Sequence, residues 1–308
     1  MKKFIAMLLV AMMALSLVAC GNDPAPTPDP EPPASTYKTG LGMVVSMSGT
    51  DAEDEDPAKT QADVTVCEAT FDQDGKIVAI SFDVVQAKAT VDADGVVTVA
   101  EDVKTKLELG PNAHDHTDTP AVEELKSTCT ISVTAFLNAL TKAYDNATTE
   151  YTGYAKAGLG MVTNMSGTDA EDEDPAKTQA DVTAVALALD ADGKIVAISI
   201  DVVQAKATVD ADGVVTVAED VKTKRELGDD YNMKKYATPA AVGEWYEQAN
   251  AFEAYCIGKT ADEVAGMPLG ENAHGYTDAP AVEELKSSCT ISVTAFLNTI
   301  AKAAANAK

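Results

Sequence analysis

The segment DVVQAKATVDADGVVTVAEDVKTK, at residues 83–106, determines how this chain is organised, because it occurs again, unchanged, at residues 201–224. A second segment, SGTDAEDEDPAKTQADVT, is duplicated at residues 48–65 and 166–183 with the same spacing of 118 residues. Identity over such lengths indicates tandem copies of one structural unit. Each copy is long enough to bury a core of its own, so we predict two domains and not a solenoid of small repeats.

The two copies differ by one insertion. Residues 112–114 (NAH) match residues 272–274 at a spacing of 160 instead of 118, so the second copy carries 42 extra residues between Gly228 and Gly270. Beyond the insertion the copies again run in parallel, PAVEELKSTCTISVTAFLN against PAVEELKSSCTISVTAFLN. We therefore predict a short repeat 1 at residues 37–150 and a longer repeat 2 at residues 151–308, with an extra helical block at 229–270.

The first half of each copy has the pattern of β-hairpins. Polar and apolar residues alternate over residues 63–71, DQDG follows as a turn, and residues 76–85 are again rich in strand-forming residues. A second turn at Asp94-Gly95 separates residues 89–91 from residues 96–99, and repeat 2 has the same two Asp-Gly turns. This pattern predicts antiparallel hairpins.

The second half of each copy has the pattern of helices, so we expect an α+β fold with two tandem repeats. In repeat 1 the apolar stripe has helical spacing and consists of Val133, Phe136, Leu137, Leu140 and Tyr144. The extra block of repeat 2 adds a helix whose apolar face consists of Val242, Trp245, Tyr246, Ala249 and Phe252.

The N-terminal segment predicts export and lipid anchoring. Lys2 and Lys3 precede an apolar run that is too short for a stable membrane span, as in a signal peptide. The run ends in LVAC at Cys20, which resembles the lipobox of bacterial lipoproteins, in which this Cys is lipidated. The alternative is an ordinary secretory signal with an accidental Cys. Residues 1–20 are thus expected to be the signal, and the Pro-rich residues 21–36 an extended tether.

The charge of the chain restricts its partners. There are 49 acidic and 23 basic residues, and loss of Lys2 and Lys3 with the signal changes the net charge from −26 to −28. Such a field repels nucleic acid, so we expect no nucleic-acid partner. Five Cys, one of them at the anchor, do not form a disulfide scaffold.

Two patterns are compatible with metal ions, and each has a simpler interpretation. The acidic runs at residues 51–56 and 169–174 are contiguous and lack the Gly of a calcium loop, which favours solvated loops. His114, His116 and Asp118 have ligand-like spacing, but repeat 2 has Tyr276 where the second His stands. A metal central to both repeats is therefore not expected, and we assign no metal ligands.

A hydroxyl-rich segment precedes the last helix of each repeat: KSTCTIS from Lys126 and KSSCTIS from Lys286. Helix N-termini favour anions because their first backbone N–H groups are unpaired. The simplest interpretation is that these Ser and Thr side chains only cap the helix.

The same segment resembles the flavinylation motif of FMN-binding domains, in which Ser or Thr, Gly, Ala and Thr precede a helix. In that family a flavin transferase, using FAD, joins FMN to the final Thr through a phosphodiester. Thr290 and Thr130 match that Thr, and Ser287 and Ser127 match the opening residue of the motif. The chain departs from the motif at two positions in each repeat. It has Ser288 and Thr128 where the motif has Gly, and Cys289 and Cys129 where the motif has Ala.

Further features are similar to one branch of this family, the flavin-bearing lipoproteins of Gram-positive bacteria. They are the lipobox, the tether, the tandem copies, the GLG opening at residues 40–42 and the WYEQA helix at residues 245–249. The resemblance implies a lipid-anchored electron carrier on the extracellular face of the cytoplasmic membrane. Its partners would be a flavin transferase, a quinol-linked membrane donor and extracellular acceptors. Because repeat 1 lacks the aromatic block, Thr290 is the stronger candidate.

The remaining cysteines and the alternative functions complete the predictions from the sequence. Cys67 is matched by Val185, which predicts a buried apolar role. A Cys256–Cys289 disulfide is compatible with an extracellular location. The alternatives to an electron carrier are a non-catalytic surface lipoprotein that binds a ligand or protein and, with less support, a metal-dependent enzyme that uses the His loops.

Overall fold

Two similar sheets, each followed by helices, make up the part of the chain that the computed structural model describes, residues 35–109, 131–237 and 240–308. Residues 34–308 cluster as one unit, to which both repeats belong. Among the described residues, no helix is both long and apolar enough to cross a bilayer. The proposed lipid site at Cys20 and residues 21–34 of the tether lie outside the described residues.

Each repeat forms a four-stranded antiparallel sheet with its strands in sequence order. The first sheet consists of β1 (Tyr37–Thr50), β2 (Ala58–Asp72), β3 (Ile77–Val91) and β4 (Val97–Val99). The second consists of β5 (Lys156–Thr168), β6 (Ala176–Leu189), β7 (Ile195–Val209) and β8 (Val215–Val217). The prediction of an α+β fold with tandem hairpins is confirmed.

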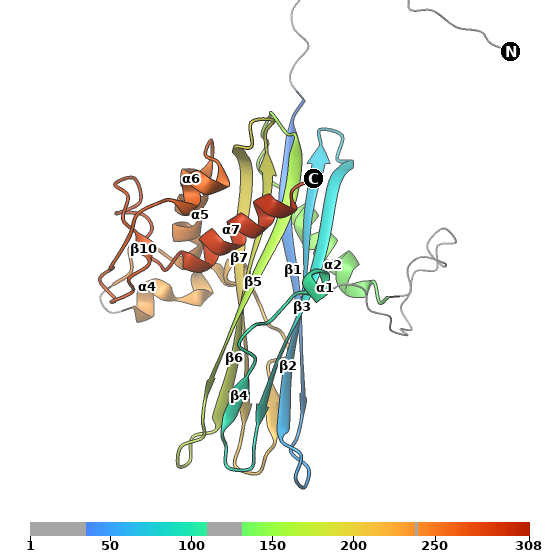
Figure 1. The fold of residues 1–308 in the computed structure, drawn as a ribbon, viewed down its shortest axis with the longest axis vertical. Helices are drawn as coiled ribbons and strands as arrows, with labels where there is room; N and C mark the ends of the chain where they lie inside the picture. The colour runs from blue at the N-terminus through green and yellow to red at the C-terminus, as the bar shows by residue number, and fades with distance from the viewer. Residues whose placement is uncertain (1–34, 110–130, 238–239) are drawn as a thin grey trace, which may run out of the picture. The chain divides into compact units, whose positions relative to one another are not determined.

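The helices differ between the repeats because of the inserted block (Figure 1). Repeat 1 has α1 (Lys106–Leu109) and α2 (Thr134–Asn146). Repeat 2 has the counterparts α3 (Lys224–Leu227) and α7 (Thr294–Asn306), and between them the 3-10 helix η1 (Gly228–Tyr231), α4 (Met233–Tyr236), α5 (Trp245–Cys256), α6 (Ala261–Ala265) and the short pair β9 (Leu269–Gly270) and β10 (Ala279–Pro280). In Figure 1 the inserted helices gather beside α7, on the side of the second sheet.

The Asp-Gly turns are where the sequence predicts them. Gly75 and Gly95 have φ of 76° and 77°, which a residue without Cβ adopts at little cost. Asp72 Oδ1 accepts hydrogen bonds from the backbone N–H groups of Asp74 and Lys76, both at 2.9 Å. No prediction was made for β1, and the β-rich segments at residues 76–85 and 89–91 both contribute to the single strand β3. The identical segments therefore form longer ribbons than the local pattern indicates.

The GLG openings allow a helix to lie directly on the first strand of each sheet. A Cβ on Gly40 would lie 1.8 Å from the carbonyl oxygen of Ala143, and one on Gly158 would lie 2.0 Å from that of Ala303. This close approach buries the small Ala139 and Ala143 of α2 and leaves Leu137 largely exposed, at 59%. The predicted helix is present, but its apolar stripe is only partly buried, because the close contact with the strand selects small residues and leaves Leu137 and Tyr144 exposed.

Gly158→Ala is expected to lower the free energy of unfolding by about 3 kcal/mol or more, since the new methyl group meets backbone and not a movable side chain. Chemical denaturation measures the effect. Gly266→Ala is a matched control, because a Cβ there meets nothing closer than 3.4 Å, and it should change stability by less than about 0.5 kcal/mol. Equal stability of the two variants would contradict this role of Gly158.

The two sheets share their core and make reciprocal contacts. One hydrophobic cluster contains Leu41, Met43 and Val64 from repeat 1 together with Leu159, Met161 and Val182 from repeat 2. Thr60 and its counterpart Thr178 hydrogen bond to each other at 3.0 Å through their hydroxyls. A residue that contacts its own counterpart lies on the axis of a two-fold arrangement.

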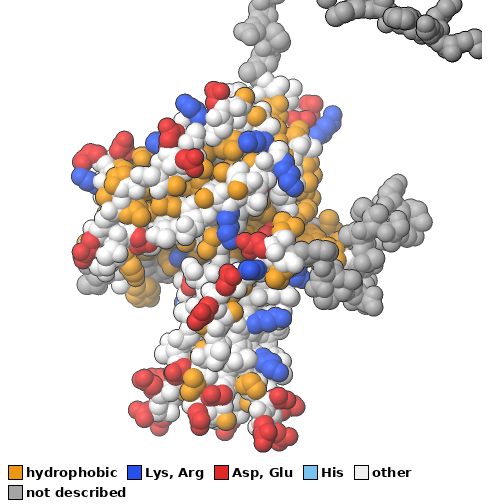
Figure 2. Space-filling model, in the orientation of Figure 1, with side chains coloured by type: hydrophobic (Ala, Val, Ile, Leu, Met, Phe, Trp, Pro, Cys, Tyr) orange, Lys and Arg blue, Asp and Glu red, His pale blue; other side chains and the backbone are white. Residues whose placement is uncertain are grey.

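The hairpin ends extend this reciprocity. The carboxylate of Asp51 accepts from the backbone N–H of Val215 at 2.8 Å, and that of Asp169 accepts from Val97 at 2.7 Å. Two ion pairs repeat the pattern, Lys142 with Glu226 and Lys302 with Glu108. Figure 2 shows acidic side chains gathered at the end of the molecule where these loops lie. Each acidic loop thus supplies a carboxylate that accepts a hydrogen bond from a backbone N–H group of the opposite repeat.

Candidate functional site

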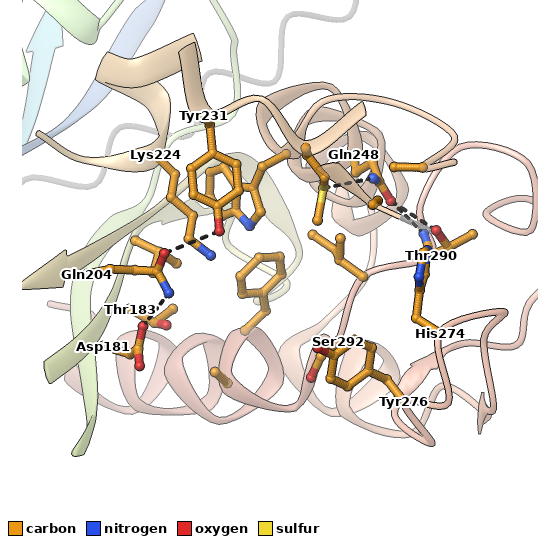
Figure 3. A pocket seen from close by; sticks show the side chains of 18 of the residues that line it. Asp181, Thr183, Gln204, Lys224, Tyr231, Gln248, His274, Tyr276, Thr290 and Ser292 are labelled. Carbon is orange, nitrogen blue, oxygen red and sulfur yellow. Dashed lines mark hydrogen bonds between the residues drawn. The ribbon is translucent and has the colours of Figure 1, made fainter. Parts of the chain in front are cut away.

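A pocket of about 720 Å³ lies in repeat 2, between the second sheet, the inserted block and the start of α7 (Figure 3). Its apolar lining includes Val202, Met233, Trp245, Ile291 and Phe296. Trp245 and Phe296 pack edge to face, with ring centroids 6.0 Å apart. This volume and lining are typical of sites for small molecules and cofactors.

Thr290 lies at one end of the pocket, and its hydroxyl is held by Gln248. The Gln248 side-chain oxygen accepts from the Thr290 backbone N–H at 2.9 Å and from the Thr290 hydroxyl at 3.2 Å. Gln248 comes from α5 and is 1% exposed, and its own amide donates to the Gly243 carbonyl at 2.9 Å. Asn272 donates to the Thr290 carbonyl at 2.6 Å. The inserted block therefore fixes both the backbone and the hydroxyl of Thr290.

Lys224 lies at the other end of the pocket. Its Nζ is 4.9 Å from the ring centroid of Tyr231 and 5.3 Å from that of Trp245, both within cation–π range. Burial lowers the pKa of Lys224 to about 8, although the carboxylates of Asp181 and Asp201 raise it in part. This end of the pocket therefore carries a cation that is held among aromatic rings.

Hydrogen-bonded polar groups surround Lys224. Asp181, on β6, accepts from Gln204 Nε2 and from Gln179 Nε2, both at 2.8 Å. The Tyr231 hydroxyl donates to the Gln204 side-chain oxygen at 3.3 Å. Burial raises the pKa of Tyr231, so the phenol keeps its proton. These groups present both donors and acceptors along one edge of the pocket.

Arg225, next to Lys224, fastens the inserted block to the sheet. Its guanidinium donates to the Ile200 carbonyl on β7 at 2.5 Å and, on α5, to Asn250 at 2.8 Å and to the carboxylate of Glu253. The counterpart in repeat 1 is Leu107, which is 68% exposed. The inserted block is thus held to the sheet by Arg225, and the repeat that lacks the insertion has leucine at this position.

The start of α7 differs from the capping that the sequence suggested. The helix begins at Thr294, its N-cap residue is Val293, and no side chain of that residue caps it. Asp278 takes this role instead, because its carboxylate accepts from the Ser292 hydroxyl and from Thr294. Partial burial tends to raise the pKa of Asp278, but these hydrogen bonds lower it overall. The simple cap interpretation of Thr290 is therefore wrong, since Thr290 lies four residues before the helix.

The other candidate residues of repeat 2 are not in the pocket lining. Ser287 is exposed in the turn before Cys289. Cys289 and Cys256 are both buried in the core of repeat 2, and both are free thiols. Burial raises the pKa of each thiol to about 12. Cys67 is likewise buried, as predicted from its match with Val185, so these three Cys are core residues.

Repeat 1 has part of the same site. Asp63 accepts from Gln61 at 2.7 Å and from Gln86 at 2.6 Å, which repeats the arrangement around Asp181. Thr130, Ser127 and Cys129 lie outside the described residues, as do His114 and His116. The chain has no insertion in repeat 1 and therefore no counterparts there of Tyr231, Trp245 and Gln248.

Four pocket residues were not singled out from the sequence: Lys224, Tyr231, Gln248 and Asn272. Figure 3 places His274 beside Thr290, although the His loops were interpreted as structural. Lys224 is the last residue of the identical segment 201–224, and Gln248 is the fourth residue of WYEQA. Both were within the quoted motifs, but only the fold brings them to one pocket. Among the described residues, no group of three or more His, Cys, Asp or Glu is arranged to hold a metal ion.

Comparison with known proteins gives one partial similarity. Chlorophenol reductase of Desulfitobacterium hafniense is 33% identical over 120 residues, which cover 35% of this chain and 36% of that protein. The chain thus matches only about a third of the length of this curated relative. No family model matches the chain, and no solved structure matches it.

Proposed function

We propose that this protein is a membrane-anchored extracellular electron carrier that holds FMN covalently at Thr290 through a phosphodiester. The observation that carries the proposal is the position of the Thr290 hydroxyl, which lies at one end of an aromatic pocket and is oriented by Gln248. Thr130, with Ser127 and Cys129, is the second candidate attachment site. The partial similarity to a protein named as a reductase supports a redox role.

The residues of the pocket fit this group. Trp245, Tyr231 and Phe296 supply aromatic surface for a planar ring system, and the edge formed by Asp181, Gln204 and Lys224 supplies hydrogen-bonding partners for its polar atoms. FMN bound here would supply reversible electron transfer. The chain itself would retain the cofactor, limit its orientation and reduce the access of water to it.

Attachment requires an enzyme that activates Thr290. The Thr290 hydroxyl donates to a Gln248 amide oxygen, which is not a base at neutral pH. We therefore assign activation to a flavin transferase. In this step the Thr290 oxygen forms a new bond to the FMN phosphorus of FAD, the phosphoanhydride bond breaks, AMP leaves and the hydroxyl proton is released.

The anchor and tether complete the proposal. Lipidation at Cys20 would hold the protein at the extracellular face of the cytoplasmic membrane, and residues 21–36 would allow it to move between a quinol-linked donor in the membrane and extracellular acceptors. Covalent retention suits this location, because a dissociated cofactor would be lost by diffusion. The net negative charge of the chain would repel nucleic acids, so we expect no acceptor of that kind.

The test is co-expression of the full chain with a flavin transferase, followed by intact mass and in-gel fluorescence after denaturation. The proposal expects a fluorescent band and the mass increment of one FMN through a phosphodiester. A denatured band with neither signal would remove the proposal and leave the non-catalytic surface lipoprotein as the better explanation of the pocket. Metal analysis of the same sample addresses the weaker enzyme alternative.

A further inference from the structure

We propose that Lys224 is the residue that sets the reduction potential of the cofactor in this pocket, by placing a fixed positive charge beside the polar edge of the ring. The inference rests on the proposed function. It assigns to a residue of the duplicated segment a role that its counterpart in repeat 1 does not share.

Lys224 and Thr290 belong to the same pocket. Thr290 and Lys224 line opposite ends of one pocket (Figure 3), and Trp245 and Phe296 are among its other lining residues. A cofactor attached through its phosphate at Thr290 would extend from there into the pocket, toward the end that Lys224 lines. The aromatic side chains of the lining would then be available to pack against its ring system.

The surroundings of Lys224 hold its ammonium group in place. Its ammonium group lies near the faces of Tyr231 and Trp245, which favour a cation over a neutral amine. Burial lowers the pKa of Lys224, and the carboxylates of Asp181 on β6 and Asp201 on β7 offset part of that effect and support the charge. Tyr231 and Gln204 provide uncharged surroundings. A lysine in this setting is less mobile than a surface lysine, so its charge acts from a defined place.

Reduction changes the charge of a flavin ring system. Uptake of two electrons from the membrane donor and one proton from solvent leaves one negative charge on the ring system. A nearby cation stabilises that charge more than it stabilises the neutral oxidised ring, and low local dielectric increases the difference. Lys224 therefore favours the reduced form and raises the potential. Lys106, its counterpart, lies in α1 of a repeat without the aromatic block.

The experiment uses the full flavinylated chain and four variants: Lys224→Met, Lys224→Arg, Lys106→Met and Asp181→Asn. Equal loading is checked first by intact mass and visible absorbance. Redox titration of Lys224→Met should show a ratio of reduced to oxidised cofactor about tenfold lower at a given ambient potential, which corresponds to a shift of about −30 mV for two electrons. Lys224→Arg should retain most of the wild-type potential, because it keeps the charge.

Two control variants should not lower the reduction potential. Lys106→Met should leave the potential unchanged, and Asp181→Asn should raise it, because a negative charge beside Lys224 is removed. A Lys224→Met potential equal to wild type, or an equal shift in Lys106→Met, would overturn the role of Lys224. Absence of flavin from the wild-type chain is a separate outcome, since it contradicts the proposed function and is visible in the mass before any titration.

Discussion

Thr290→Ala is expected to abolish the proposed covalent attachment of flavin, whereas Thr130→Ala should keep one flavin per chain. The hydroxyl of Thr290 is the group that would form the phosphodiester, and alanine has no oxygen to replace it. The pocket that would receive the ring is built around Thr290 by the inserted block. Repeat 1 has the strand residues of this site but no counterparts of Trp245 and Gln248.

Intact mass of the two variants, co-expressed with the transferase, decides the matter. Thr290→Ser is the control that keeps an oxygen at the same position, and it should retain part of the load. A full flavin increment in Thr290→Ala together with none in Thr130→Ala would place the attachment site in repeat 1 and reverse the assignment. Two increments in the wild type would show that both repeats are loaded.

Glu68→Gln is expected to make the folded state more stable by up to about 3 kcal/mol at pH 8, with little change at pH 4. Glu68 is fully buried on β2, and one carboxylate oxygen accepts from the Thr70 hydroxyl at 2.8 Å. The other oxygen receives no hydrogen bond from the described residues. Burial raises the pKa of Glu68 from 4.5 to about 7, although the Thr70 hydrogen bond lowers it in part.

The direction follows from the proton balance. Between pH 4.5 and 7 the folded protein holds a proton on Glu68 that the unfolded chain has already released. Stability associated with this group is therefore fully present below pH 4.5 and is lost as the pH rises through about 7. At about 1.4 kcal/mol for each pH unit, the loss amounts to about 3 kcal/mol. Glutamine does not ionise, so the Glu68→Gln variant does not lose this stability as the pH rises.

The measurement is the difference between Glu68→Gln and wild type in urea unfolding, from pH 4 to pH 8. Other titrating groups, such as Asp201, affect both proteins and cancel in that difference. Glu55→Gln, in an exposed loop, is the control and should follow wild type throughout. If the curves for Glu68→Gln and wild type run parallel over the whole range, Glu68 does not titrate as described here.

The polar cluster around Glu68 also distinguishes the two repeats. Thr70 bonds to Thr39 at 2.8 Å, and Thr39 bonds to the Tyr151 hydroxyl at 2.6 Å. Repeat 2 has alanine at the positions that correspond to Glu68, Thr70 and Thr39, which are Ala186, Ala188 and Ala157. Repeat 1 therefore lacks the aromatic block of the pocket but contains a buried carboxyl at a position where repeat 2 has alanine.

Much of the fold could be predicted from the sequence because its strongest signals are local. The Asp-Gly turns determine the hairpins, and their Asp side chains bond to the backbone within the same turn. The helix–strand contact at Gly158 was not predicted, because nothing near Gly158 in the sequence indicates that Ala303 lies against it. The pairing of the two sheets was missed for the same reason.

The candidate site was predicted only in part. Thr290 was identified through its motif, and the structure places it in the pocket. Lys224 and Gln248 were missed because they lie 66 and 42 residues before Thr290, so only tertiary packing brings the three together. Ser287 and Cys289 belong to the motif, yet one is exposed and the other lies in the core. Adjacency in sequence did not give adjacency in the pocket.

The reciprocal contacts between the repeats have a consequence for how the protein tolerates change. Because the contacting segments are identical, each half presents a surface that complements itself, as in a symmetric dimer. Joining the halves in one chain makes their association intramolecular, with an effective concentration in the millimolar range for a short connection. A modest intrinsic affinity is then enough to keep the halves together. One half is thereby free to lose or gain a binding function while the other continues to support the shared core.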